Sequence, residues 1–198
     1  MYELRSLKNR MRADYSDRRR KITSEEKAIR DRKICDTFVS LVTYRYADTL
    51  LMYYPTAYEI DVRPIAERAI KDGKRIAFPR CKSDDRTMTF HYVTDIREVN
   101  ELSEYKIPEP SEYAPVFDPD FCKKEKNVCL IPALVYDNDG YRLGYGKGYY
   151  DRYLTRFHGT RVGVVYSDFI VEQVPRGKYD LSVNLLMTEK GVKVINAG

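Results

Sequence analysis

The pattern of apolar and polar positions predicts three helices in the first part of the chain. The first covers roughly Glu3 to Arg20 and carries many arginines. The second begins at Thr23-Ser24-Glu25-Glu26, which resembles a capping box with Thr23 as the cap. The third runs from about Arg63 to Lys71 and is closed by Gly73. The second helix has its apolar positions at helical spacing: Ile29, Ile34, Phe38, Leu41 and Val42.

Short apolar runs between and after these helices predict strands. One strand covers Thr49 to Tyr53 and ends at Tyr54-Pro55, because proline blocks a central hydrogen-bond ladder. Another covers Arg75 to Phe78 and is stopped by Pro79. Further strands are predicted at Thr87–Tyr92, Val128–Val135, Arg161–Tyr166 and Val183–Met187.

Strands that alternate with helices predict an α/β fold with a mostly parallel sheet. The chain has 198 residues and fits one domain spanning residues 1–198. The proline-rich stretch from Tyr105 to Pro119 is predicted to be an ordered surface loop, not a domain boundary.

The composition is that of a soluble globular protein, with 43% hydrophobic and 33% charged residues. No apolar run approaches membrane length, and no apolar signal region follows the first residues. The four cysteines form no Cys-x-x-Cys pair and have no metal spacing with His91 or His158. We therefore expect reduced thiols, a cytoplasmic location and no membrane partner.

The net charge of +5 is concentrated near the start of the chain. Such a segment can face nucleic acid, a membrane surface or a polyanionic small molecule, and it can also be a solvated helix face. The cations that crowd it are Arg5, Lys8, Arg10, Arg12, Arg18, Arg19, Arg20 and Lys21.

The richest local chemistry lies where Gly144, Gly146 and Gly148 alternate with Tyr145 and Lys147. An apolar run and an Asp-Asn-Asp-Gly turn precede these residues, and an aromatic run follows, so the order is strand, turn, glycine-rich loop and helix. Glycines let the backbone approach a phosphate, and the lysine adds a full charge. The spacing matches neither a Walker A loop nor the dinucleotide pattern, and glycine-rich turns before helices are also common without any ligand.

Asp151 lies in the first turn of the helix predicted over Tyr149 to Phe157. A carboxylate there favours the helix dipole but repels a bound phosphate, unless a divalent cation lies between them. The loop therefore suggests a magnesium–nucleotide complex. Ligands in open α/β sheets lie beyond the carboxyl ends of the strands, where three segments of this chain could converge: Tyr54–Glu59, Pro79–Arg80 and Gly144–Lys147.

Over nearly its full length the chain resembles the 5-formyltetrahydrofolate cyclo-ligase (methenyltetrahydrofolate synthetase) family. The specific element is Arg142-Leu-Gly-Tyr-Gly-Lys-Gly-Tyr-Tyr-Asp151, preceded by Ile131-Pro-Ala-Leu-Val-Tyr-Asp137. Weaker elements agree in order and spacing: Lys8 with Arg12, Tyr54-Pro55 with Glu59, Gly73-Lys74 with Pro79-Arg80, Ile107-Pro-Glu-Pro110, and Val174-Pro175 with Asp180 before Thr188-Glu189.

The resemblance implies a Rossmann-like three-layer sandwich, with helices on both faces of the sheet, and a ligase of folate one-carbon metabolism. Such enzymes use ATP and Mg²⁺ to convert 5-formyltetrahydrofolate into 5,10-methenyltetrahydrofolate, ADP and phosphate. It implies that Lys147 and Arg142 act in catalysis, and that Asp151 and Asp180 hold Mg²⁺. Tyr54, Glu59, Tyr149 and Tyr150 would bind the folate. The ATP site would comprise Lys8, Arg12, Arg142, Leu143, Gly144, Tyr145, Gly146, Lys147, Gly148, Tyr149 and Tyr150.

The chain departs from the family pattern at Asn184, where many relatives carry an acidic residue, so we assign no metal there. Met88 and Phe90 could touch the pterin, but we expect both in the core. Two other hypotheses stay open: an RNA-binding protein that uses the basic first segment, and a paralogue with the same scaffold and another substrate. We expect a monomer with small-molecule substrates and no nucleic-acid partner.

Overall fold

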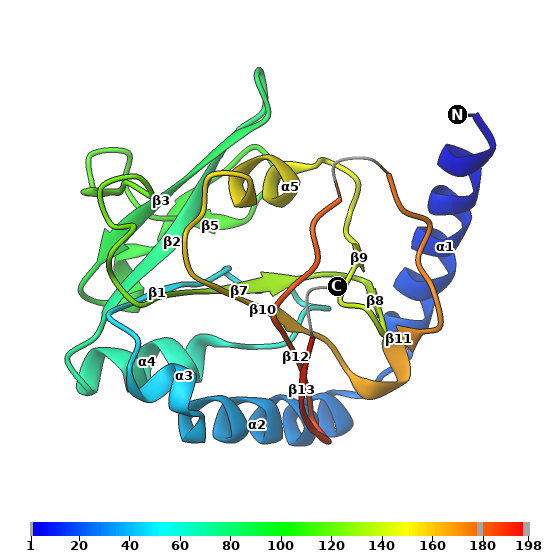
Figure 1. Cartoon of the computed structure of the whole chain (residues 1–198), viewed down its shortest axis with the longest axis horizontal. Helices are drawn as coiled ribbons and strands as arrows, with labels where there is room; N and C mark the ends of the chain where they lie inside the picture. Colours follow the sequence, from blue (N-terminus) through cyan, green and yellow to red (C-terminus); the bar gives the residue numbers. More distant parts are fainter. Residues whose placement is uncertain (1, 178–179, 196–198) are drawn as a thin grey trace.

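The fold is taken from a computed structural model that describes residues 2–177 and 180–195. Its centre is an eight-stranded sheet in the order β13-β12-β10-β7-β1-β2-β3-β6 (Figure 1). The strands are β1 (Thr49–Leu51), β2 (Arg75–Lys82), β3 (Thr87–Val93), β6 (Val116–Phe117), β7 (Asn127–Pro132), β10 (Thr160–Val164), β12 (Leu185–Thr188) and β13 (Gly191–Val194).

The five central strands, from β12 to β2, pair in parallel, and the strands outside them pair antiparallel. Parallel strands are covered on both faces and therefore read as continuous apolar runs. β1 is buried along its whole length, and Cys129, Leu130 and Ile131 of β7 are fully buried. The mostly parallel α/β sheet predicted from the sequence is confirmed.

Helices cover both faces of this sheet (Figure 1). On one face lie α2 (Ser24–Ser40), α3 (Val42–Arg45) and α4 (Arg63–Lys71), and on the other lies α5 (Tyr149–Leu154). Helix α1 (Tyr2–Arg20) stands beside a small second sheet, against which Met11 and Tyr15 pack. That sheet contains β8 (Val135–Asp137), β9 (Arg142–Leu143) and β11 (Ile170–Val171).

Short elements fill the connections. Two 3₁₀ helices cover Ile96–Glu98 and Ser167–Phe169. The stretch predicted to be a loop from Tyr105 to Pro119 is ordered, but it contains β6 and one strand of a two-stranded ribbon. The ribbon consists of β4 (Glu101–Leu102) and β5 (Pro108–Glu109).

The predicted helix starts follow from local chemistry. The Thr23 hydroxyl accepts a hydrogen bond from the Glu26 backbone N–H at 3.2 Å and caps α2. The Glu26 carboxylate pairs with Arg30, one turn further on. Helix α4 has the predicted bounds and carries a proline in its first turn, where a missing N–H costs nothing.

Several predicted boundaries were wrong. β2 continues through Pro79 to Lys82, because β1 pairs only with Arg75 to Ala77 and proline beyond that point has β3 alone as a neighbour. The predicted strand from Val128 to Val135 breaks into β7 and β8. Pro132, which has no N–H, is the last residue of β7.

The end of the chain also differs from the prediction. The predicted helix over Tyr149 to Phe157 stops at Leu154. The predicted strands at Arg161–Tyr166 and Val183–Met187 are displaced by one or two residues, as β10 and β12. No pattern predicted β13, which pairs antiparallel with β12.

Candidate active site

A cavity of about 410 Å³ lies at the carboxyl ends of β1, β2 and β7, and we call it the central cavity. All residues that the sequence analysis assigned to nucleotide, folate or metal line it. They come from α1, from the loop after β1, from the glycine-rich segment, and from Asp180 in the loop after β11. These wall residues are Lys8, Arg12, Tyr54, Glu59, Arg142, Leu143, Gly144, Tyr145, Gly146, Lys147, Gly148, Tyr149, Tyr150, Asp151 and Asp180.

The glycine-rich segment passes from β9 to α5 with two residues at positive φ. Gly148, the N-cap of α5, has φ 75°, and Gly146 has φ 94°. Both conformations favour glycine. A Cβ at Gly146 would also lie 3.0 Å from the guanidinium carbon of Arg12. Arg12 donates from Nε to the Gly144 carbonyl at 2.9 Å, so α1 fixes the loop directly.

Two ion pairs hold the two aspartates of the wall, Asp151 and Asp180. Lys8 Nζ lies 2.9 Å from Asp180 Oδ2, and the Gly177 N–H donates to the same oxygen at 2.7 Å. Arg142, only 8% exposed, pairs with Asp151 and donates to the Leu181 carbonyl at 3.0 Å. These contacts bring the two predicted metal ligands to the wall from distant parts of the chain.

Two other cations of the wall are less completely paired. Burial lowers the pKa of Arg12, although the charge of Asp180 opposes this shift. The exposed Lys147 ammonium lies 5.3 Å from the centroid of the Tyr105 ring. In the structure, which describes residues 2–177 and 180–195, Lys147 has no carboxylate within ion-pair distance.

The carboxylates of the wall bear on whether the site could hold a divalent cation. Among the described residues, no three His, Cys, Asp or Glu side chains form a cluster that could hold a metal ion. Mg²⁺ needs no such cluster, because it commonly takes one or two carboxylates and completes its shell with water and phosphate oxygens. Asp151 and Asp180 on one cavity wall fit that requirement.

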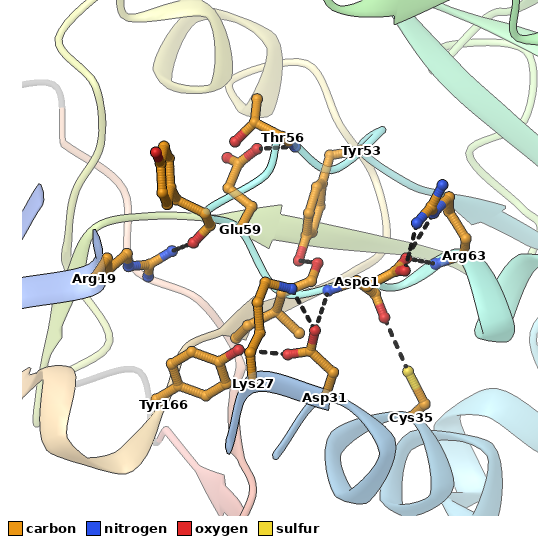
Figure 2. A network of polar contacts seen from close by, with 12 residues as sticks. Arg19, Lys27, Asp31, Cys35, Tyr53, Thr56, Glu59, Asp61, Arg63 and Tyr166 are labelled. Atoms are coloured by element: carbon orange, nitrogen blue, oxygen red, sulfur yellow. Dashed lines mark hydrogen bonds and ion pairs between the residues drawn. The ribbon is translucent and has the colours of Figure 1, made fainter. Parts of the chain in front are cut away.

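Glu59 is a buried carboxylate of the wall, 6% exposed. Its Oε2 accepts from the Thr56 N–H at 2.9 Å (Figure 2). The loop around it is anchored by Arg19, which donates to the Tyr58 carbonyl at 3.4 Å, and by the Tyr53 hydroxyl, which donates to the Ile60 carbonyl at 2.9 Å. These anchors hold Glu59 at the cavity.

Asp31 of α2 provides a further anchor, at the Asp61 end of this loop (Figure 2). Its carboxylate accepts from the Asp61 N–H at 3.0 Å, from Lys27 Nζ at 2.5 Å and from the Tyr166 hydroxyl at 2.5 Å. Asp31 is 6% exposed, so these bonds lie largely out of water. Local sequence patterns did not reveal this network, because Asp61 and Tyr166 lie 30 and 135 positions from Asp31.

The tyrosines of the wall have different surroundings. The Tyr149 hydroxyl lies 3.1 Å from that of Tyr105, at the rim. The Tyr150 hydroxyl is buried without a hydrogen-bond partner among the described residues. Half of Tyr145 is exposed, but burial of its hydroxyl and the nearby Glu59 carboxylate raise its pKa, so the hydroxyl keeps its proton.

Several wall residues had been given no role from the sequence. Met88, expected in the core, is buried and also lines the cavity. Arg80, expected near the ligand, does not line the cavity and pairs with Glu101 at 2.5 Å. The motif Ile107-Pro-Glu-Pro110 could have indicated one part of the wall, because its first three residues line the cavity. The residues without a prior role are Tyr53, Thr56, Cys81, Ser103, Tyr105, Ile107, Pro108, Glu109 and Pro132.

Other residues weighed from the sequence lie outside the cavity. His91 is buried and bonds the Ala114 carbonyl at 2.9 Å, and burial lowers its pKa. His158 is exposed, and Asn184 accepts from the Arg161 N–H at 2.8 Å.

All four cysteines are free. In the part of the chain that the structure describes, no helix has the length and apolar character to cross a membrane.

A mostly parallel sheet with a cavity at the carboxyl ends of its strands defines an α/β protein with a small-molecule site. Comparison with known proteins gives the family. The model of the 5-formyltetrahydrofolate cyclo-ligase family matches residues 5–189, and the chain belongs to this family of ligases.

Individual relatives match over almost the whole chain. The 5-formyltetrahydrofolate cyclo-ligase of Mus musculus is 24% identical over 192 residues, covering 93% of this chain and 94% of the mouse protein. The NMR structure of 5,10-methenyltetrahydrofolate synthetase from Aquifex aeolicus has a TM-score of 0.83 and 29% identity, covering 97% of this chain and 94% of that one. The structure of a 5,10-methenyltetrahydrofolate synthetase from Mycoplasma pneumoniae has a TM-score of 0.73 and 25% identity. The match covers 92% of this chain and 98% of that one.

Proposed function

We propose that this chain converts 5-formyltetrahydrofolate and ATP into 5,10-methenyltetrahydrofolate, ADP and phosphate in the presence of Mg²⁺. Family membership supports the overall reaction. One structural observation carries the assignment of the site. The residues that the resemblance assigns to ATP, folate and metal come from four separate segments, and all of them line the central cavity.

The nucleotide half of the site depends on positive charge. Lys8 and Arg12 lie one turn apart on α1 and reach the cavity beside the exposed Lys147. Phosphoryl transfer requires positioning and charge neutralisation more than covalent chemistry from the protein. In our proposal these three cations bind the triphosphate, and the loop from Gly144 to Gly148 lets the backbone approach it.

Asp151 and Asp180 are the residues that would hold Mg²⁺. When bound, the ion neutralises charge on the phosphate oxygens and orients them. Arg142 and Lys8 hold these carboxylates at the wall in the free protein. We therefore assign two roles to Arg142: it positions Asp151, and it binds the phosphates.

The folate half of the site is assigned to Tyr54, Glu59, Tyr149 and Tyr150. A formamide is a poor electrophile because its nitrogen donates into the carbonyl. Transfer of the γ-phosphoryl group to the formyl oxygen creates a leaving group and releases ADP. The folate N10 then bonds to the formyl carbon and loses its proton, and the carbon–oxygen bond breaks to release phosphate.

The test is the ultraviolet absorbance of the purified protein mixed with 5-formyltetrahydrofolate, ATP and Mg²⁺. We expect the methenyl chromophore to appear, and to be lost when ATP is omitted or when Mg²⁺ is chelated. Absence of the chromophore from a folded protein that still binds ATP would overturn the proposal and favour the paralogue hypothesis.

A further inference from the structure

Glu109 of β5 is a second buried carboxylate in the wall of the central cavity. It is 7% exposed, and its Oε1 accepts from the Cys81 N–H at 3.0 Å. Its Oε2 accepts no hydrogen bond from any residue in the described ranges 2–177 and 180–195. No Lys, Arg or His of those ranges lies within ion-pair distance of this carboxylate.

The neighbouring groups explain why Glu109 stays unpaired. Arg80, the nearby cation, is engaged by the Glu101 carboxylate and by the Pro110 carbonyl. The wall around Glu109 is formed largely by apolar or weakly polar side chains, including Met88 and Ile107. A carboxylate removed from water is costly unless donors compensate it. The free oxygen of Glu109 therefore requires donors that the cavity contents supply.

Three groups of the two substrates can supply such donors: the ribose hydroxyls of ATP, its adenine edge and the pterin ring of folate. The ribose hydroxyls are common partners of a carboxylate, so parallel binding of an ATP analogue must separate them from the pterin. Phosphates and the glutamate carboxylates of folate would be repelled by a carboxylate. The adenine edge offers one amino donor beside a ring acceptor. The 2-amino-4-oxo pterin ring offers an amino group next to a ring N–H, and a pair of adjacent donors matches the two oxygens of a carboxylate.

We propose that Glu109 is a substrate-recognition residue whose carboxylate accepts hydrogen bonds from the amino group and the adjacent ring N–H of the folate pterin. This inference rests on the proposed function, because it takes the folate as the ligand. Glu59, the other buried carboxylate of the wall, already has the Thr56 N–H and lies near the Tyr145 hydroxyl. Glu109 has fewer protein donors than Glu59, because the Cys81 N–H is its one hydrogen-bond donor among the described residues.

Recognition of this kind depends on pH. Burial raises the pKa of Glu109, the Cys81 N–H and the charge of Arg80 oppose this shift, and Glu101 adds to it. Burial raises the pKa of the adjacent Cys81 to about 12, so that thiol stays neutral. Only the ionised carboxylate accepts from both pterin donors. The affinity for folate should therefore fall as the pH drops through the raised pKa of Glu109.

The experiment is calorimetric titration of the full chain with 5-formyltetrahydrofolate, without ATP, from pH 4.5 to pH 8. The variant is Glu109→Gln, which keeps an oxygen for the Cys81 N–H but presents an amide N–H to the pterin donors. The matched control is Glu112→Gln, an exposed carboxylate outside the cavity. Binding of a non-hydrolysable ATP analogue and thermal melting are measured in parallel.

We expect Glu109→Gln to raise the Kd for 5-formyltetrahydrofolate about ten- to hundredfold at pH 7.5, as for a lost charge-assisted hydrogen-bond pair. The Kd of the ATP analogue and the melting temperature should stay close to those of the unmodified protein, as should all properties of Glu112→Gln. A residue that only anchors Cys81 would leave folate affinity unchanged in Glu109→Gln, and that result would overturn the proposal.

The pH profile of the unmodified protein gives a second test that needs no variant. Affinity that rises with pH in the unmodified protein, and a weaker rise in Glu109→Gln, would support the proposal. A flat profile in the unmodified protein would contradict it. Failure of the unmodified protein to bind 5-formyltetrahydrofolate at any pH would instead overturn the proposed function, and with it the ligand assigned to Glu109.

Discussion

Lys147 is an exposed cation of the cavity wall, and its neighbour across 5.3 Å is the ring of Tyr105. Substitutions at exposed positions with so few contacts usually change stability by less than about 0.5 kcal/mol. We expect Lys147→Ala to unfold at the same temperature as the unmodified protein. Its kcat should fall about 100-fold or more, because removal of one charge stabiliser from a transition state typically costs that much.

The measurement is steady-state formation of the methenyl chromophore, with Lys124→Ala as the control. Lys124 is also an exposed lysine but lies outside the cavity. Equal activity in both variants would show that Lys147 does not act on the phosphates, and the assignment of the glycine-rich loop would have to change.

At the scale of single residues, the sequence was most informative where chemistry is local. Gly146 and Gly148, which the sequence singled out, have positive φ values that favour glycine, and Asp151 lies in the first turn of α5 as predicted. The sequence did not indicate roles that depend on a distant partner. Glu109 is one example. It has no cation partner among the described residues because Arg80, 29 positions earlier, pairs with Glu101.

Among the elements, the loop between β1 and α4 is held at two points, by Arg19 of α1 and by Asp31 of α2 (Figure 2). We expect Asp31→Ala to lower the free energy of unfolding by about 1–3 kcal/mol, because it leaves the Asp61 N–H and the Tyr166 hydroxyl without their acceptor. The loop should loosen, so that the KM for 5-formyltetrahydrofolate rises more than the KM for ATP.

Hydrogen exchange of residues 54–62 and the two KM values provide the measurement, and Asp36→Ala serves as the control. Asp36 lies on the same helix but is exposed, so its removal should change neither quantity. Unaltered exchange in this loop together with an unaltered folate KM in Asp31→Ala would show that the network does not position Glu59.

The same long-range contacts explain which elements sequence patterns missed. Helix α4 was predicted with its observed bounds because a proline and an apolar stripe define it locally. The break between β7 and β8 involves Arg19, which donates to the Ala133 and Leu134 carbonyls from more than 110 positions away. No local sequence pattern reveals that a buried guanidinium donates hydrogen bonds to these carbonyls.

For the molecule as a whole, the cavity exists only when distant segments meet. The Lys8–Asp180 pair joins positions 172 residues apart, and Arg12 reaches the Gly144 carbonyl across 132 positions. The sequence could name most of the wall because the family resemblance and the rule for parallel sheets place these segments at one edge. It could not supply the contacts that order the wall before any ligand arrives.

The packing also bears on how the chain unfolds. One apolar cluster extends from Ile34 of α2 to Met187 of β12. A smaller cluster around Leu134 and Leu143 lies under α1, and Tyr15 packs against both clusters. We therefore expect the single domain predicted for residues 1–198 to unfold in one cooperative transition.

Far-ultraviolet circular dichroism and tyrosine fluorescence provide independent probes, because the chain has 18 tyrosines and no tryptophan. Their thermal or urea transitions should coincide. Saturating 5-formyltetrahydrofolate should shift both by the same amount, since a ligand that binds only the folded state stabilises the whole cooperative unit. An early transition seen by one probe alone would contradict a single cooperative unit, and α1 with the small sheet is the part we would then expect to melt first. In that case Lys8 and Arg12 would reach the cavity only while that part stays docked.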